Sequence, residues 1–261
     1  MRPIFAIART TVGEAIRRKV LLIILLIGLV VLIIAPGLGV LSTRSSDTVL
    51  RSMMLGIIQL TSAVIAIVLT VYMIPNEIER RTIYTILSKP VHRWQFLVGK
   101  YLGAIGALGL MMGLMTIVMV IFFYFQQRNL PAAISLLQPP ILYFVQMSLL
   151  TAVAIFFSTF VAPLVNFFLT GGMFVLGTTF NPLLESLQGN ANTAPATKMF
   201  VTLLGTLLPN FANYNVANPI INPGQQIVNT NAYYLNVTGY GIVYIAVLLI
   251  GGILIFERRE V

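Results

Sequence analysis

The sequence predicts an all-α membrane protein with six transmembrane helices, because charge is scarce, uncharged segments are long and basic residues are grouped. Only 9% of the 261 residues are charged and 58% are hydrophobic, whereas soluble domains usually carry about 25% charged residues. A helix needs roughly 20 apolar residues to cross the hydrocarbon core of a bilayer. Five windows without Asp, Glu, Lys or Arg are at least that long: 20–43, 52–76, 101–127, 129–184 and 199–256.

These windows divide into six spans within a single transmembrane domain, residues 1–261. The first three windows hold one span each, and the fourth is long enough for two spans with a tight turn at Ala162-Pro163. Only the end of the fifth window is apolar enough to cross. Pro36-Gly37 is expected to kink or fray the end of the first span. The predicted spans are 20–40, 53–74, 101–125, 141–160, 164–180 and 239–256.

Residues 1–19 predict an amphipathic helix that lies at the membrane interface before the first span. Its apolar residues recur at helical spacing and share one face: Ile4, Ile7, Ala8, Thr11, Val12, Ala15 and Ile16. A simple tail with basic anchors is the alternative. We do not expect a cleaved signal peptide, because the apolar run that follows is longer than the roughly 7–15 residues of a signal core.

Basic residues gather on one side of the predicted membrane. Alternating spans place the N-terminal segment, the segment 75–100 and the C-terminal tail together, and these regions hold twelve of the 16 Lys and Arg residues. The positive-inside rule then makes both termini cytoplasmic and the segment 181–238 external. This topology also accounts for the net charge of +9, so we expect the lipid bilayer, and no nucleic acid, as the partner of the basic residues.

The external segment permits two interpretations. Residues 199–208 are apolar but too short to span, which is typical of a re-entrant or interfacial helix. The following stretch is rich in Asn and Pro, which is typical of turns. The segment is either an ordinary extracellular loop or a lid over the outer mouth of a pathway, and the residues favour neither.

Residues that carry catalytic or metal chemistry are missing from the spans. The chain has no cysteine and one histidine, His92, in a predicted cytoplasmic segment, so a thiolate site, a histidine metal site or a Ser-His-Asp triad in the membrane is excluded. Gly99-Lys100 lacks the first glycine and the Ser or Thr of a nucleotide-binding loop. No ionisable residue lies at mid-depth, which argues against proton coupling. We therefore expect no catalytic residue, cofactor or metal, and no enzyme activity in this chain.

Two groups of side chains inside the spans are assigned to packing. Scattered polar residues such as Gln59, Gln146 and Asn166 are expected to join helices rather than to bind substrate. Methionines cluster on the third span, where filling the core is favoured over a soft-metal path: Met111, Met112, Met115 and Met119.

The charged segment between the second and third spans is the most informative part of the chain. Asn76 is a plausible N-cap, two glutamates follow in the first helical turn, and Glu77 can pair with Arg81 four residues later. Pro90 ends this helix, and a second short helix, 92–100, leads into the third span. An apolar stripe of Ile78, Thr82, Ile83, Ile86 and Leu87 favours protein docking over a loop that only sets topology.

The same segment resembles the membrane subunit of type-2 ABC (ATP-binding cassette) exporters. The resemblance rests on Glu77-Ile-Glu-Arg-Arg-Thr82, Leu87-Ser-Lys-Pro90, Arg93 and Gly99-Lys100, and it extends to the order of elements over the whole chain. It implies a permease in the plasma (inner) membrane of a prokaryote. Such a permease pairs with a second copy or with a related permease, and binds two copies of a separate ABC ATPase subunit.

The resemblance also implies roles for individual residues. The helix after the second span would be a coupling helix that sits in a groove of the ATPase, braced by the N-terminal helix. The pathway would follow the dimer seam, lined mainly by the second and fifth spans, with the external segment as outer gate. The implied ATPase-coupling residues are Glu77, Ile78, Glu79, Arg80, Arg81, Ile83, Ile86 and Arg93.

The leading hypothesis is therefore a permease subunit that alternates between two packings as its partner hydrolyses ATP. The absence of acidic residues from the predicted seam favours a lipid-like or amphiphilic substrate over a cation. One alternative is a mechanical transmitter that uses the partner's ATP to move an external protein. A membrane-embedded lipid-modifying enzyme or assembly factor is the other, and the lack of intramembrane His, Asp and Glu weighs against it.

Overall fold

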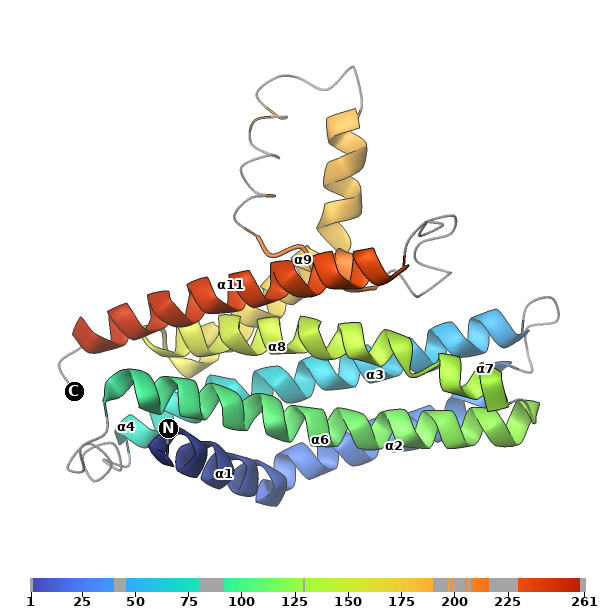
Figure 1. Ribbon diagram of the computed structural model, residues 1–261, viewed down its shortest axis with the longest axis horizontal. Helices are drawn as coiled ribbons and strands as arrows, with labels where there is room; N and C mark the ends of the chain where they lie inside the picture. The colour runs from blue at the N-terminus through green and yellow to red at the C-terminus, as the bar shows by residue number, and fades with distance from the viewer. Residues whose placement is uncertain are drawn as a thin grey trace.

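The computed structural model describes residues 2–39, 46–79, 92–128, 130–189, 208–215 and 230–258, and residues 197, 199 and 205 singly. Within this part of the chain every regular element is a helix (Figure 1), which confirms the predicted all-α class. The elements are α1 (Arg2–Arg17), α2 (Lys19–Gly39), α3 (Ser46–Val71), α4 (Met73–Glu79), α6 (Arg93–Gln127), α7 (Leu130–Ser135), α8 (Gln138–Ser158), α9 (Pro163–Gly189), the 3-10 turn η1 (Ala212–Tyr214) and α11 (Thr230–Arg258).

The long helices alternate in direction, so that both termini lie at the same end of the bundle (Figure 1). The helices α2, α6 and α9 lead away from this end, while α3, α8 and α11 return to it. We call it the basic end, because most of the basic residues that the structure describes lie there: Arg9, Arg17, Arg18, Lys19, Arg93, Lys100 and Arg258.

Not every predicted span is equally clear in the structure. Among the residues that the structure describes, four helices are long and apolar enough to cross a membrane: Val49–Glu77, Arg93–Gln126, Ala133–Ser158 and Ala232–Arg258. A pair bent by 63°, Pro3–Arg17 with Lys19–Ala35, brings the number to five, and Pro163–Thr179 is a shorter apolar helix. The helices thus lie where six spans were predicted, while the count of six stays a prediction.

The helices are longer than the apolar windows from which they were predicted. The helix α2 continues through Pro36 to Gly39, so its end is not frayed within the described residues. The helix predicted over 92–100 is present from Arg93, but it is the first part of α6, which runs unbroken for 35 residues, and not a short helix of its own. Hydrophobicity reports where lipid surrounds a helix, whereas backbone hydrogen bonding continues into the polar regions on either side.

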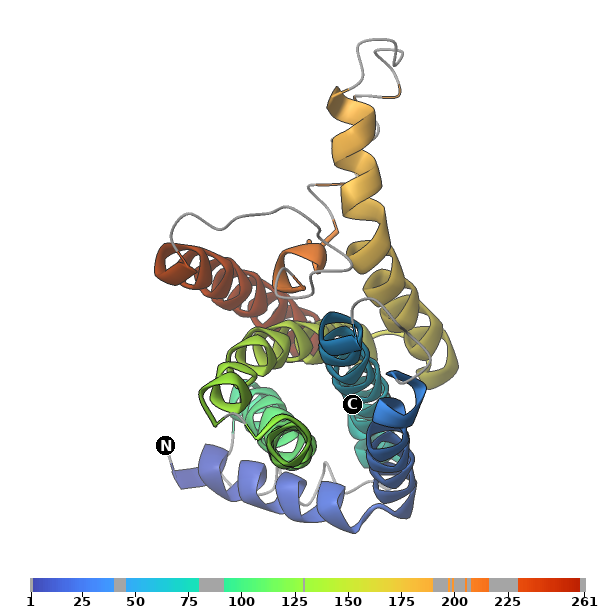
Figure 2. The same ribbon diagram turned by 90° about the vertical axis from the view of Figure 1, so that its right-hand side faces the viewer.

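The N-terminal helix α1 packs across the outside of α6 (Figure 2). Glycines of α6 allow this approach, since a Cβ atom at Gly103 would lie 2.5 Å from Thr11 Cβ and 2.8 Å from the Ala8 carbonyl oxygen. At Gly99 it would lie 2.9 Å from Ile7 Cβ. The helix that we predicted is confirmed, and much of its apolar face contacts α6.

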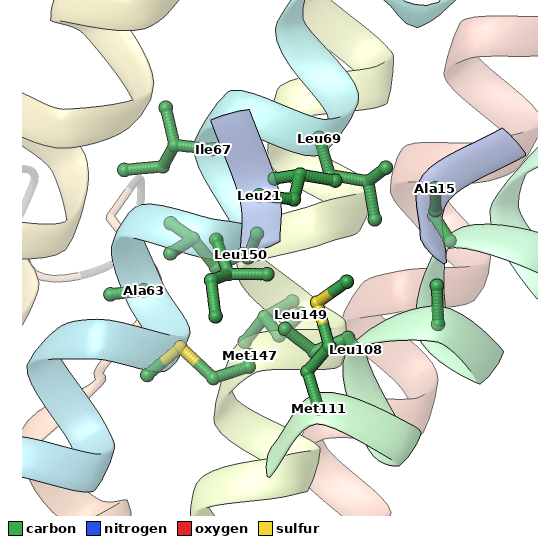
Figure 3. Packing of buried hydrophobic residues seen from close by; sticks show 14 of the residues in the cluster. Ala15, Leu21, Ala63, Ile67, Leu69, Leu108, Met111, Met147, Leu149 and Leu150 are labelled. Atoms are coloured by element: carbon green, nitrogen blue, oxygen red, sulfur yellow. The ribbon is translucent and has the colours of Figure 1, made fainter. Parts of the chain in front are cut away.

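The core is centred on α3 and α8, with α6 beside them (Figure 3). In the most apolar stretch of each helix, 72% of the residues are buried in α3 and in α8, against 17% in α11. The helices α2, α9 and α11 therefore present exposed side chains such as Leu26, Phe168 and Val247, an apolar surface that suits contact with lipid. The methionines of α6 are buried in the core, as predicted: Met111, Met112, Met115 and Met119.

We predict that Gly103→Ala destabilises the protein by about 1–3 kcal/mol, the usual cost of overpacking. The new methyl group would displace α1, because its closest neighbours include the backbone oxygen of Ala8. Gly113→Ala is the matched control on the same helix, where a Cβ atom meets nothing within 4 Å. The free energy of unfolding of the purified protein in nanodiscs checks this, and equal effects of the two changes would contradict the packing of α1 on α6.

Candidate functional site

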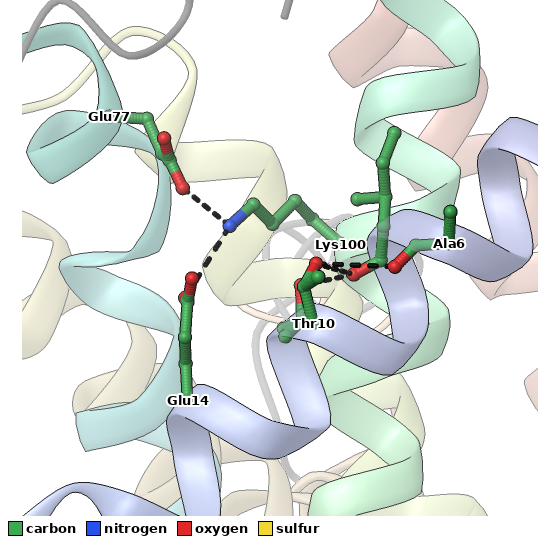
Figure 4. Close-up of polar contacts among 7 residues, drawn as sticks. Ala6, Thr10, Glu14, Glu77 and Lys100 are labelled. Carbon is green, nitrogen blue, oxygen red and sulfur yellow. Dashed lines mark hydrogen bonds and ion pairs between the residues drawn. The ribbon is translucent and has the colours of Figure 1, made fainter.

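A buried ion pair at the basic end joins α1, α4 and α6 (Figure 4). The Lys100 Nζ atom lies 2.6 Å from Glu77 Oε1 and 3.9 Å from Glu14 Oε2. We call these three residues the lysine junction. They come from positions 14, 77 and 100, so the junction connects the N-terminal helix with the helices on both sides of the predicted coupling segment.

The two carboxylates of the lysine junction differ in how much they contribute to stability. The side chains of Lys100 and Glu77 are 5% and 15% exposed, whereas that of Glu14 is 56% exposed. An exposed and long ion pair contributes little to stability. Loss of one partner from a buried pair leaves an uncompensated charge in a poorly solvated place, which is strongly destabilising. Glu77 is therefore the carboxylate that makes burial of Lys100 possible.

The local sequence of α6 explains how a lysine comes to be buried at the end of the bundle. Lys100 lies between Gly99 and Gly103, the two positions at which α1 approaches most closely. Its Nζ atom also lies 5.8 Å from the centroid of the Phe96 ring, which is a favourable place for a cation. The glycines thus bring α1 over the lysine, and Glu77 neutralises the charge that becomes covered.

The helix α4 begins earlier than the sequence predicted. It follows α3 after one turn residue, Tyr72, and the Asn76 backbone N–H donates to the Tyr72 carbonyl oxygen at 3.1 Å. Asn76 is therefore inside the helix, and its prediction as an N-cap is wrong. Pro75 is tolerated because it lies in the first turn of α4, where backbone N–H groups have no partner within the helix.

Arg93 ties the start of α6 to the end of α11. Its Nη1 atom donates to the carbonyl oxygens of Phe256 and Glu257 at 3.0 and 3.4 Å. A cation at this position also matches the partial negative charge of a helix C-terminus. The ring of Phe256 stacks on that of Phe96, with 6.2 Å between centroids. Two adjacent turns of α6 thus anchor α1, α4 and α11 at the basic end.

The structure brings together only part of the predicted coupling set. Glu77 and Arg93 have the contacts given above, and the structure describes the backbone but not the side chains of Ile78 and Glu79 in α4. The remaining members lie outside the described residues: Arg80, Arg81, Ile83 and Ile86. Sequence reasoning did not assign Lys100 or Glu14 to the site, although the spacing of Gly99 and Gly103 around a lysine was a usable signal.

A second polar site lies in the other half of the bundle, where residues 208–215 are wedged among α8, α9 and α11. We call these residues the wedge segment. Phe211 and Tyr214 are fully buried within it. A Cβ atom at Gly177 of α9 would collide with the Phe211 ring, and one at Gly241 of α11 would lie 2.7 Å from the Tyr214 hydroxyl oxygen. Two glycines thus leave the space that two aromatic side chains fill.

The backbone of the wedge segment is bonded to the neighbouring helices. The Phe211 N–H donates to the Gly177 carbonyl at 3.1 Å, and the Phe211 carbonyl accepts from Gln146 Nε2 at 3.1 Å. The Gln146 Oε1 atom accepts in turn from Gln59 Nε2 at 3.0 Å. Irregular backbone beside apolar helices is tolerated only when the protein satisfies its polar groups. Gln59 and Gln146 therefore join helices, as predicted.

Asparagine and tyrosine side chains complete the bonding of the wedge segment. The Tyr143 hydroxyl donates to Asn215 Oδ1 at 2.7 Å, and the Tyr214 hydroxyl donates to the Val237 carbonyl oxygen at 3.2 Å. Tyr233 donates to the Asn213 carbonyl oxygen at 2.7 Å. The Asn-rich stretch that the sequence identified as turns is, over these residues, a packed plug whose side chains hold α8 and α11 in register.

Comparison with known proteins covers almost the whole chain. A family model described as "ABC-2 family transporter protein" matches residues 5–261, and this agrees with the resemblance seen in the segment after the second span. No curated protein matches the chain.

We predict that Glu77→Gln lowers the free energy of unfolding by about 3–5 kcal/mol, because it leaves the buried ammonium group of Lys100 without a counter-charge. Adding Lys100→Met should restore most of the loss, since the charge that needs a partner is removed. Glu14→Gln is the matched control and should cost only about 0–1 kcal/mol. Denaturant unfolding in detergent measures the free energy of unfolding across this series. If the loss in the double variant equals the sum of the losses in Glu77→Gln and Lys100→Met, the lysine junction is not the stabilising contact.

Proposed function

Because the chain belongs to the ABC-2 family of transporter proteins, we propose that it is the permease subunit of an ATP-binding cassette exporter. Two permeases, either two copies or one copy and a related chain, would form the pathway and bind two separate ATPase subunits. Apart from family membership, the proposal is supported mainly by the lysine junction. This ion pair fixes α1, α4 and the start of α6 relative to one another at the end where a partner would dock.

The basic end is the proposed docking side for the ATPase. The segment 80–91, which lies outside the described residues, leaves α4 and returns to α6 at this end. The end of α4 and this segment together would supply the contacts with the ATPase, polar ones from Glu79, Arg80 and Arg81 and packing ones from Ile78, Ile83 and Ile86. The grouping of basic residues here supports a cytoplasmic location for this end and for both termini.

The proposed mechanism transmits motion through rigid contacts. A push on α4 would pass through the Glu77–Lys100 pair at 2.6 Å to α6, and through the Arg93 contacts to α11. Packed helices move as bodies between discrete arrangements rather than deforming gradually. A partner can shift such an equilibrium only through contacts that differ between the two states, and the segment after α4 would supply those contacts.

The proposed substrate is lipid-like or amphiphilic. All seven acidic residues lie outside the middle of the predicted spans, so a cation crossing the membrane would meet no carboxylate. The wedge segment would act as the outer gate, because its contacts join α8, α9 and α11 on the side away from the basic end.

A mechanical transmitter is the second candidate, and the course of α9 favours it. This helix continues for ten residues beyond the apolar stretch Pro163–Thr179, and its last part projects sideways from the bundle, across the direction of the long helices (Figures 1 and 2). A projecting helix offers an external partner protein a surface to hold. On this reading the movements driven at the basic end would reach that partner through α9.

We predict that Arg81→Ala and Ile83→Asp each weaken binding of the ATPase about tenfold or more, the range expected for central residues of an interface. Neither residue belongs to the lysine junction, so folding of the permease should be kept. Arg128→Asn at the opposite end is the charge-matched control, because Asn tolerates the positive φ of 53° at that position. The assay is co-purification with a candidate ABC ATPase, followed by permease-stimulated ATP hydrolysis. If both variants bind and stimulate like the wild type, the coupling assignment fails.

A further inference from the structure

A cavity of about 380 Å³ lies at the elbow where α1 passes into α2. We call it the elbow cavity. The two helices bend by 63° at this point, and the turn between α3 and α4 closes the other side. Its volume falls within the roughly 300–1,000 Å³ that is usual for small-molecule sites.

The rim of the elbow cavity is cationic and polar. Arg18 and Lys19 line it from the elbow, and Tyr72 and Asn76 line it from the turn after α3. The ion pairs between described residues involve Glu14, Glu77 and Lys100, and neither Arg18 nor Lys19 takes part in them. The rim therefore holds two positive charges, and no described carboxylate lies within ion-pair distance of either.

The floor of the elbow cavity is apolar and continues into a lipid-facing surface. It is formed by Val20, Leu21 and Val68. Val20 is 58% exposed, and the next turns of α2 expose Ile23 and Ile27 to 58% and 56%. A soluble anion would gain nothing from an apolar floor, whereas a phospholipid needs cations for its phosphate and apolar surface for its acyl chains.

The position along the bundle also fits a lipid headgroup. The cavity lies inward from the basic end, where α1 passes into α2 (Figure 1), beside the last turn of one apolar helix and the first turn of another, where the interface of a bilayer would be. Basic pockets at such places are the usual binding sites of anionic headgroups. A larger groove of about 410 Å³ between α6 and α8 is lined mainly by apolar residues and glycine, and it offers no charge that would select a headgroup.

We propose that the elbow cavity binds an anionic phospholipid, with Arg18 and Lys19 contacting its phosphate and the exposed face of α2 contacting an acyl chain. The lipid fills the angle between α1 and α2 and so supports α1 in its position across α6. This inference depends on membrane insertion and is independent of the ATPase and of the transported substrate.

The test titrates phosphatidylglycerol into delipidated full-length protein in detergent and counts bound lipid by native mass spectrometry. The wild type should bind one phosphatidylglycerol more tightly than phosphatidylcholine. The double variant Arg18→Gln/Lys19→Gln should bind it about 30-fold more weakly, as expected for two basic residues near an anionic group. The control Arg9→Gln/Arg17→Gln removes the same charge from exposed positions of α1 outside the cavity and should bind like the wild type.

A second variant keeps the test decisive if loss of the two cations impairs folding. Val68→Phe fills the floor without changing any charge, and it should also expel the lipid. Equal loss in the control and the cavity variants would overturn the proposal in favour of unspecific attraction by charge. Equal affinity for phosphatidylcholine would also overturn it, because the site would then not select an anionic headgroup. Displacement of the lipid by inorganic phosphate alone would overturn it too, because the site would then bind a soluble anion.

Discussion

Burial of the Lys100 ammonium group is the constraint on which the basic end of this protein depends. A lysine that is 4% exposed must have a counter-charge, and Glu77 supplies it from α4 at 2.6 Å. Gly99 and Gly103 let α1 cover the lysine, so the same turn of α6 sets the positions of both α1 and α4. The Lys100 side chain thereby fixes α1, α4 and the start of α6 relative to one another.

The rest of the bundle extends this arrangement. Arg93, about two turns before Lys100, adds the end of α11 to the same group of helices. In the other half, the wedge segment is held by a chain of amides from Gln59 through Gln146 to Phe211. Between these polar sites the helices pack through apolar clusters, with single hydrogen bonds such as that from Asn166 Nδ2 to the Ala154 carbonyl oxygen at 2.9 Å. Under the proposed alternation between two packings, the polar contacts would hold each end together while the apolar contacts between them change.

Charge distribution located the helices well but did not reveal how they meet. Uncharged windows mark the spans because isolated charges are excluded from lipid, and the packing roles of Met115 and Gln146 followed from general tendencies of membrane helices. The glycines around Lys100 indicate a close approach of another helix, but they do not identify its partners, because Glu77 and Glu14 are 23 and 86 residues away. The burial of Phe211 depends likewise on a space left at Gly177, 34 residues earlier, for which no local pattern exists.

The central claim is that α1 and α4 move as one body when the ATPase partner acts. Because the chain contains no cysteine, spin labels at Arg9→Cys in α1 and at Tyr72→Cys, the turn residue directly before α4, can report the distance between α1 and the start of α4 in membranes by electron paramagnetic resonance. Together with the ATPase, the wild-type junction should give one narrow distance distribution that is the same with and without ATP, while Lys100→Met should broaden it. A wild-type distance that changes on ATP binding would show that α1 and α4 separate, and would contradict the account.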